Sequence, residues 1–326
     1  ASKDTAKKDT AQAKHYVWKL QCAYPKGDQT YDVQMPMIVK TIEKATNNQI
    51  TFQCFNPGAL CEPEQAPASC ASGLMECCIS APNDCGQVVP AAYAEQGIPF
   101  YWENGQDVYD TFYDYGMLQF LRKEYAKAGL YYGMFVPNGA YSLMTKFPVN
   151  STTDLKGKKI RASSSYGEFV NQMGASPVTM PGGDLYMGLK LGTIDGCIYT
   201  VGELGNAKLM EVVSNVMVQP GSGSAPVNFI IGQKAWNALP KDLQDKVNKA
   251  MQEEFMPIYK ASVAVDDKAI AEAKAYGVKF TEVSPENMKA FWEAGSKTAD
   301  YVISQYPAAK PGIEIIKKWH TEKKAK

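Results

Sequence analysis

Short runs of β-forming residues alternate with longer stretches of helical periodicity along most of this chain. In the first half, the expected elements are a strand at 16–22, a helix at 30–46, a strand at 49–55, a helix at 63–72 and a strand at 74–80. Strands that alternate with helices are typical of a parallel sheet covered by helices, so the sequence predicts an α/β fold.

Ligands of such sheets bind where the carboxyl ends of the strands meet. The residues that follow the three expected strands are Ala23-Tyr24, Asn56-Pro57-Gly58 and Ala81-Pro82-Asn83. We therefore expect these three segments to surround one crevice.

The same alternation returns after the turn-forming residues Pro137-Asn138-Gly139, which suit an entry to a second lobe. The expected elements there are strands at 141–145, 158–162, 176–180 and 194–199, with helices at 165–173 and 184–191. A linker-like cluster at 220–226, the strand VNFIIG and a very long helical pattern from about 239 to 276 follow. The chain is therefore expected to cross between the lobes at least twice.

The length of 326 residues suits two domains of about 150 residues each. We expect a flexible leader at 1–14, because ASKDTAKKDTAQAK has no apolar periodicity. Lobe I is then 15–138 plus 226–262 and lobe II is 139–225 plus 263–326, both of them α/β. No apolar signal segment precedes the leader, so we expect that a signal peptide has been cleaved; a cytosolic chain is the alternative.

The composition excludes several classes of function. Thirty-four basic residues balance 34 acidic ones, so no global positive field would hold a nucleic acid. No stretch approaches the roughly 18 to 20 apolar residues of a membrane helix. The only histidines are His15 and His320, near the chain ends, which argues against His-based nucleophile systems and catalytic zinc.

Seven of the eight cysteines lie between positions 22 and 85, and three interpretations compete: a metal centre, buried free thiols, or disulfides in an oxidising compartment. The absence of any CxxC disfavours the metal. We expect disulfides, drawn from Cys22, Cys54, Cys61, Cys70, Cys77, Cys78 and Cys85. Adjacent residues on a strand point to opposite faces, so Cys77 and Cys78 should have different partners.

Three segments carry a resemblance to a known family: DLKGKKIRASSS at 154–165, GASPVTMPGGDLYMGLKLGTIDG at 174–196 and AWNALPKDLQDKV at 235–247. Supporting matches are NPGALCEPE at 56–64, SGLMECCISAP at 72–82 and GIPFYWENG at 97–105. In this order and spacing, from about 16 to 305, the chain resembles the extracytoplasmic solute-binding proteins of tripartite ATP-independent periplasmic (TRAP) transporters.

The resemblance implies two α/β lobes of the periplasmic-binding-protein type around a cleft, with crossing strands and a long interdomain helix, which close on a small organic acid. It also implies that Arg161, at the end of the KIR strand, pairs with the ligand carboxylate. A guanidinium is always charged and matches a carboxylate with two parallel hydrogen bonds. The alternative for an isolated arginine after a strand is a surface ion pair of about 0–1 kcal/mol.

Other positions depart from the family pattern. Tyr141 stands where many members have a second arginine, and Tyr199 stands where many have an amide. One branch of the family binds 2-oxo acids with a metal through a Glu-Trp pair at 198 and 199, but Ile198 cannot ligate a hard cation. Gly182-Gly183 replaces a bulkier Phe-Ser of some relatives. These changes suggest a monocarboxylate with a bulky or aromatic remainder.

The expected ligand-binding residues are Arg161, Tyr199, Tyr141, Tyr24, Asn138, Pro82, Asn83, Cys197, Gly182 and Asn228. Aromatic faces bury a large area, so Tyr101, Trp102 and Tyr166 are further candidates for the walls of the site, although each could instead belong to the core.

The resemblance implies a periplasmic binding protein without catalysis, which delivers its carboxylate to TRAP membrane permease subunits, and we expect no cofactor or metal. The C-terminal segment GIEIIKKWHTEKKAK has an apolar stripe that could cover its own lobe or a neighbour's. We expect it to cover its own, in a monomer. Three alternatives stay open. The protein could be a sensor, if a membrane receptor recognises the closed form of the two lobes. Asp184 or Asp195 could act as the base of an enzyme that positions a carboxylate on Arg161. The Cys-rich first lobe could belong to a redox or metal protein.

Overall fold

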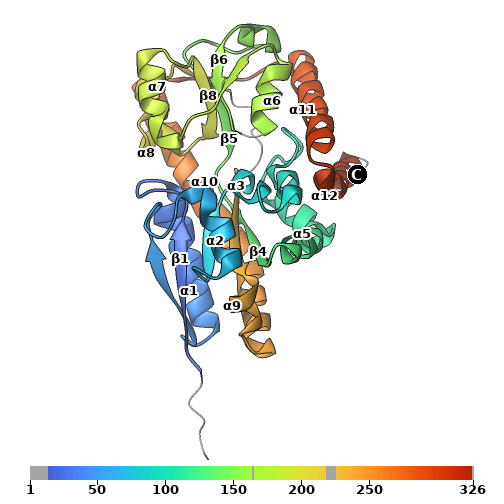
Figure 1. The fold of residues 1–326 in the computed structure, drawn as a ribbon. Helices are drawn as coiled ribbons and strands as arrows, with labels where there is room; N and C mark the ends of the chain where they lie inside the picture. Colours follow the sequence, from blue (N-terminus) through green and yellow to red (C-terminus); the bar gives the residue numbers. More distant parts are fainter. Residues whose placement is uncertain (1–13, 164, 218–224, 325–326) are drawn as a thin grey trace, which may run out of the picture.

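The computed structural model describes residues 14–163, 165–217 and 225–324, and it has two α/β lobes joined by a long helix (Figure 1). The expected leader and most of the linker-like cluster at 220–226 lie outside the described residues. Within them, no helix combines the length and the apolar character that a membrane span requires.

The first lobe is built on a five-stranded sheet in the order β2-β1-β3-β10-β4. Its strands are β1 (Tyr16–Cys22), β2 (Ile50–Phe55), β3 (Cys77–Ser80), β4 (Leu130–Pro137) and β10 (Pro226–Gly232). The helices of this lobe are α1 (Met35–Ala45), α2 (Ala66–Ser72), α3 (Pro82–Gly86), α4 (Gly105–Tyr109), α5 (Met117–Lys127) and α9 (Gln233–Asn237). Strand β10 is buried along its whole length, as expected for a central strand.

The second lobe is built on a six-stranded sheet in the order β11-β9-β5-β8-β6-β7. Its strands are β5 (Tyr141–Thr145), β6 (Lys159–Arg161), β7 (Ser176–Val178), β8 (Gly196–Thr200), β9 (Asn215–Met217) and β11 (Lys279–Thr281). Its helices are α6 (Ser165–Gln172), α7 (Leu185–Leu191), α8 (Glu203–Asn206) and α11 (Pro285–Gln305), and they contribute to two separate core clusters.

The expectation of parallel sheets was wrong, because both sheets are mixed. Strand β10 is antiparallel to β3 and β4, and β5 is antiparallel to β8 and β9. The cause is the path of the chain: β4 and β5 lie in different sheets, and so do β9 and β10. A strand that enters a sheet from the other lobe runs against its neighbours, whereas strands joined by local helices stay parallel.

Helix α10 (Lys241–Tyr276) runs continuously through both lobes, close to the bounds predicted from periodicity. Val247, Phe255 and Ile258 belong to the core of the first lobe, whereas Ala269 and Ala273 belong to a core of the second. The helix ends at Gly277, whose φ of 107° is a conformation that L-residues rarely adopt. One rigid element therefore connects the two cores.

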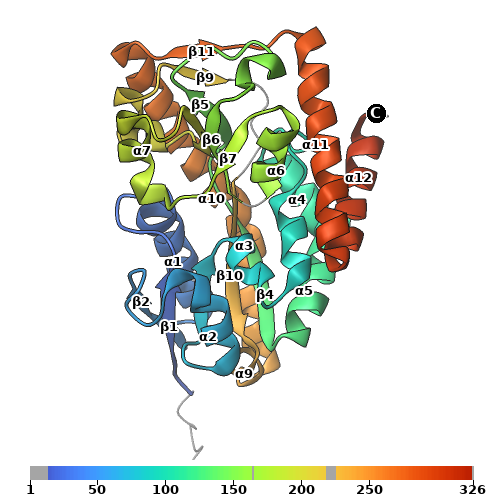
Figure 2. The same cartoon turned by 45° about the horizontal axis from the view of Figure 1, so that its top comes forward.

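The last helix, α12 (Lys310–Lys324), lies against the first lobe rather than the second. Ile313, Ile316 and Trp319 belong to the first-lobe core, and Figure 2 shows the helix beside α5 and the lower end of α11. This packing differs from the assignment of 263–326 to lobe II. The apolar stripe of α12 therefore covers a surface of this same chain.

The expected disulfides are absent: all eight cysteines, each of them among the described residues, are free. Six are buried, one is half-buried and Cys54 is exposed. Burial raises the pKa of Cys22 and of Cys197 to about 12, which suppresses the reactive thiolate. These thiols act as small apolar side chains of the core. Cys77 and Cys78 do have different partners, since Cys77 Sγ donates to Lys19 O and Cys78 contacts Cys70.

We predict that a thiol reagent will titrate eight thiols in the denatured protein without prior reduction. In the native protein Cys54 should react first and Cys61 next, because the other six side chains are buried. Absorbance of the released chromophore measures both counts. Fewer than eight thiols after denaturation would mean that disulfides form and would contradict the free state of the cysteines.

Candidate ligand-binding site

The strand ends of the two sheets meet at the junction of the lobes. In the first lobe, β1, β3 and β4 end there, and in the second lobe β6 and β8 end near the start of β5. Only residues 138–140 separate the end of β4 from the start of β5, so the two sheet edges face each other. Functional side chains in α/β proteins gather at such edges.

Arg161 is the last residue of β6, between β7 and β8, and its side chain is only 7% exposed. Its Nε donates to the carbonyl oxygen of Met180 at 3.1 Å, and its Cζ lies 5.2 Å from the centre of the Tyr199 ring. Nη1 is buried without a hydrogen-bond partner, and no carboxylate among the described residues forms an ion pair with this guanidinium. A buried charge in this state lacks a counter-ion.

Tyr199 and Tyr141 stand beside this guanidinium on neighbouring antiparallel strands. Their rings are stacked with centroids 6.3 Å apart, and Tyr166 meets Tyr141 edge to face at 5.4 Å. The backbone of Gly182 lies directly against Tyr199, since a Cβ at this glycine would overlap the phenol oxygen. The structure therefore brings together Arg161, Tyr141, Tyr199 and Gly182, four of the predicted ligand residues.

Tyr24 reaches this group from the first lobe, where it follows β1 and is half-buried. Burial raises the pKa of its phenol well above the usual value, and the neighbouring phenols of Tyr141 and Tyr199 add to the rise. The electrostatic effect of these second-lobe side chains on Tyr24 means that the three phenols lie near one another across the junction.

The other predicted ligand residues of the first lobe lie around the same edge, and they differ in burial and in hydrogen-bond partners. Pro82 is buried and Asn83 half-buried at the start of α3, where Asn83 Nδ2 donates to Asp84 Oδ1 at 2.9 Å. Asn138 is buried in the crossing segment, where its Nδ2 donates to Thr30 Oγ1 and its Oδ1 accepts from Gly139 N. The side chain of Asn138 thus helps to hold the crossing segment.

Two predicted residues lie inside the cores. Asn228 is fully buried in β10 and donates to Glu95 Oε2 at 2.9 Å, within a network that includes Tyr125 and Cys85. Cys197 is fully buried in β8, beside Arg161 in register but within a core of the second lobe. Both side chains are surrounded by core residues, and their contribution to ligand binding stays a prediction.

The three aromatic residues considered as walls of the site, Tyr101, Trp102 and Tyr166, lie in different surroundings. Trp102 is buried in the first-lobe core, where its Nε1 donates to Thr111 Oγ1. Tyr101 stacks on His320 with ring centroids 4.0 Å apart. Of the three, only Tyr166 contacts the ring of another predicted ligand residue.

Four buried polar residues beside these phenols were not predicted from the sequence. Three of them, Asp28, Glu203 and Asp266, are acidic and are called the junction acids below; the fourth is Gln29. Asp28 and Gln29 lie in the loop after β1, Glu203 begins α8, and Asp266 lies in α10. Burial raises the pKa of Glu203 to about 8 and that of Asp266 to about 7. They are scattered through the sequence, and no spacing marks them as one site.

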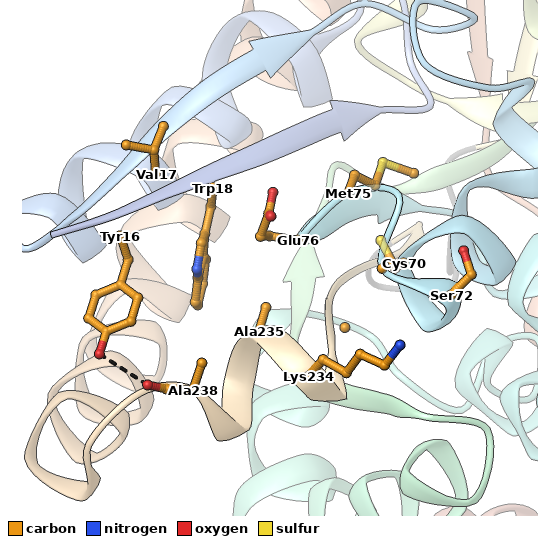
Figure 3. A pocket seen from close by; sticks show the side chains of 12 residues that line it. Tyr16, Val17, Trp18, Cys70, Ser72, Met75, Glu76, Lys234, Ala235 and Ala238 are labelled. Carbon is orange, nitrogen blue, oxygen red and sulfur yellow. Dashed lines mark hydrogen bonds between the residues drawn. The ribbon is translucent and has the colours of Figure 1, made fainter. Parts of the chain in front are cut away.

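A separate cavity of about 340 Å³ lies at the opposite end of the first sheet (Figure 3). Its lining includes Tyr16 and Trp18 at the start of β1, Cys70 of α2, Glu76 before β3 and Lys234 of α9. The polar groups that it offers are partly used, because Tyr16 donates to Ala238 O and Glu76 accepts from Lys19 N. The unpaired guanidinium lies at the junction, which makes the junction the candidate site.

Comparison with known proteins decides the family. Residues 25–305 match the family described as bacterial extracellular solute-binding protein, family 7. The chain belongs to this family. It is a TRAP-type solute-binding protein of the periplasm, and the family is one of transport proteins rather than enzymes.

Two relatives and one solved structure illustrate the similarity of this solute-binding protein to others. The monocarboxylate 2-oxoacid-binding periplasmic protein of Nostoc sp. is 26% identical over 313 residues, which cover 91% of this chain and 84% of the relative. The ectoine-binding periplasmic protein of Halomonas elongata is 23% identical, over 86% of this chain and 82% of its own. A TRAP solute-binding protein from Desulfovibrio salexigens, solved with bound orotic acid, superposes with a TM-score of 0.83 at 20% identity and covers 94% of this chain and 99% of its own.

We predict that this solute-binding protein loses stability as the pH rises from about 5 to 8. Carboxyl pKa values raised in the folded state mean that the folded chain binds more protons than the unfolded chain in this window, so the free energy of unfolding falls with pH. Glu203→Gln removes one of these protons and should flatten the dependence. Denaturant unfolding across this pH range measures it, with Glu282→Gln, at an exposed position of the second lobe, as control. Equal slopes for Glu203→Gln and the wild-type protein would contradict the burial of an uncompensated carboxyl.

Proposed function

We propose that this protein captures a small organic acid in the periplasm by pairing the ligand carboxylate with Arg161, and delivers it to TRAP membrane permease subunits without catalysis. The observation that carries the proposal is the buried guanidinium whose Nη1 has no hydrogen-bond partner among the described residues. Leaving such a group unpaired is costly, and an entering carboxylate would satisfy it.

The fixed orientation of Arg161 supports recognition of a planar anion. Its Nε is already held by the Met180 carbonyl, and the Tyr199 ring lies near its Cζ. The guanidinium therefore loses little freedom when it binds, which favours tight association. A charge-assisted hydrogen bond of this kind contributes about 1.5–3 kcal/mol.

The surroundings of Arg161 favour a monocarboxylate with a bulky or aromatic remainder. Tyr141 replaces a second arginine clamp, and the phenols of Tyr24, Tyr141 and Tyr199 offer aromatic area with polar tips. The Nostoc relative is named for monocarboxylate 2-oxoacids, but Ile198 brings no oxygen to a cation here. We therefore propose a carboxylate held without a metal bridge.

In the proposed function, ligand binding closes the two lobes, and the permease recognises the closed form. A ligand that binds the closed form more tightly shifts the population toward it, and the closed monomer then meets the permease. A membrane receptor could read the same closure, and no feature of the site favours that sensory role. Neither candidate base of the enzyme alternative forms a hydrogen bond or ion pair with Arg161 in the described structure: Asp184 is exposed, and Asp195 accepts from Lys159 N at 2.9 Å.

We predict that Arg161→Ala will weaken binding of the carboxylate ligand by at least about tenfold while the fold is retained, because a charge-assisted contact is lost. The ligand is identified by mass spectrometry of material carried through purification, and its affinity is measured by calorimetry. Lys146→Ala, which removes one exposed positive charge from the same lobe, should bind as the wild-type protein does. Unchanged affinity in Arg161→Ala would refute the carboxylate role.

We also predict that Gly182→Ala will weaken the same binding, because its Cβ would push the Tyr199 phenol away from its present position. Gly183→Ala is the matched control, since a Cβ there meets no atom within 4 Å. Calorimetry with the same ligand measures both variants. Equal affinities for the two alanine variants would show that the position of the Tyr199 ring has no part in binding.

A further inference from the structure

The junction acids form a strongly acidic region that the carboxylate-binding role of Arg161 does not explain. Asp28, Glu203 and Asp266 are 8%, 4% and 6% exposed, and they come from the first lobe, the second lobe and the connecting helix. Three carboxyl groups from separate parts of the chain are thus buried at the place where the lobes join. Burial keeps protons on Glu203 and Asp266 near neutral pH, and a positive group beside them would favour their charged forms.

No basic side chain of the described residues supplies that partner. None of the three acids takes part in an ion pair with a lysine or arginine there. Their hydrogen bonds come from backbone N–H groups and uncharged side chains. Asp28 accepts from Thr30 N at 2.7 Å and is also bonded to the Thr30 side chain, Asp266 accepts from Ala140 N at 2.8 Å and from the backbone of Gly202, and Glu203 accepts from Asn206 Nδ2 at 3.5 Å. Asp28 and Asp266 instead raise the pKa of Glu203 further.

Gln29 gives a second and independent sign of a missing partner. It is only 2% exposed, yet neither its Oε1 nor its Nε2 has a hydrogen-bond partner among the residues that the structure describes. Its Nε2 points to the same place as Asp266: a Cβ on Gly202 would lie 3.5 Å from Gln29 Nε2 and 3.3 Å from Asp266 Oδ1. A buried amide beside a carboxylate, with both of its polar atoms unpaired in the described part of the chain, indicates a position for a polar ligand group.

Tyr199 lies close both to Arg161 and to the junction acids. The Tyr199 ring is 5.2 Å from Arg161 Cζ, and Tyr199 stands three residues before Gly202, which has Gln29 Nε2 and Asp266 Oδ1 around it. Burial raises the pKa of the Tyr199 hydroxyl, the charges of Asp28 and Glu203 raise it further, and the charge of Arg161 lowers it. Tyr24 is likewise affected by Asp28. The site therefore combines a guanidinium, aromatic rings and a group of acidic side chains.

We propose that the ligand is a zwitterion, with its carboxylate on Arg161 and a protonated nitrogen group held by Asp28, Glu203 and Gln29 next to the phenols. This inference rests on the proposed function and narrows its ligand class. The aromatic rings suit a cation as well as an apolar body. The described residues contain no group of three or more His, Cys, Asp or Glu side chains arranged to hold a metal ion, so an organic cation is the better fit.

Matched pairs of carboxylates test the proposal in thermal-shift and calorimetric titrations of the full chain. The pairs are δ-aminovalerate with hexanoate, para-(aminomethyl)benzoate with para-ethylbenzoate, and proline with cyclopentanecarboxylate; each replaces a protonated nitrogen by carbon. We expect the nitrogen compound of at least one pair to bind at least about tenfold more tightly, the gain of a charge-assisted contact. Glu203→Gln should remove that advantage, and Glu282→Gln should keep it.

The outcomes separate the two proposals. If the carbon analogues bind as tightly as their nitrogen partners in every pair, or if Glu203→Gln keeps the preference, the zwitterion inference is wrong and the role of Arg161 stands. If all compounds bind Arg161→Ala as they bind the wild-type protein, the carboxylate proposal is wrong. Binding of none of the six compounds to the wild-type protein also overturns the zwitterion inference. Should Glu203→Gln fail to fold, Gln29→Ala replaces it, with loss of the nitrogen preference as the expected result.

Discussion

The buried guanidinium of Arg161 is the group on which this account of the protein depends. It stands at the end of β6, held by the Met180 carbonyl and lying 5.2 Å from the Tyr199 ring, and it keeps one nitrogen without a hydrogen-bond partner in the described part of the chain. A charge in this position destabilises the protein unless something anionic enters. The guanidinium lies at the edge where the two lobes meet. A buried positive charge at such an edge suits a protein that binds organic acids between its lobes.

The lobe junction is also the place where the proposed closure would occur. Residues 138–140 and helix α10 connect the lobes, and Asp266 of this helix accepts from the backbone of Ala140 in the crossing segment. The same junction buries acidic side chains from both lobes. Groups that bind a ligand and groups that join the lobes are thus neighbours, so a bound ligand can change the relative stability of open and closed forms through direct contacts.

Much of the fold could be predicted from local pattern, whereas the direction of some strands could not. The alternation of strands and helices and the length of α10 follow from periodicity, which is a property of neighbouring residues. The antiparallel β10 and the packing of α12 on the first lobe depend on where the chain crosses between lobes, which periodicity does not encode. The prediction of disulfides was wrong because the sequence does not distinguish a buried free thiol from a disulfide-bonded cysteine. The two differ in the distance between the sulfur atoms, which depends on the folded structure. The resemblance pointed to Arg161, Tyr141 and Tyr199, but Gln29 and the junction acids are scattered through the chain and carry no motif.

The decisive measurement is a crystal structure of the protein with the ligand that it carries through purification. We predict a carboxylate oxygen at about 2.7–2.9 Å from Arg161 Nη1, with the rest of the molecule beside Tyr141 and Tyr199. Density for the ligand elsewhere, with that guanidinium nitrogen bonded to a protein group or to water alone, would contradict it.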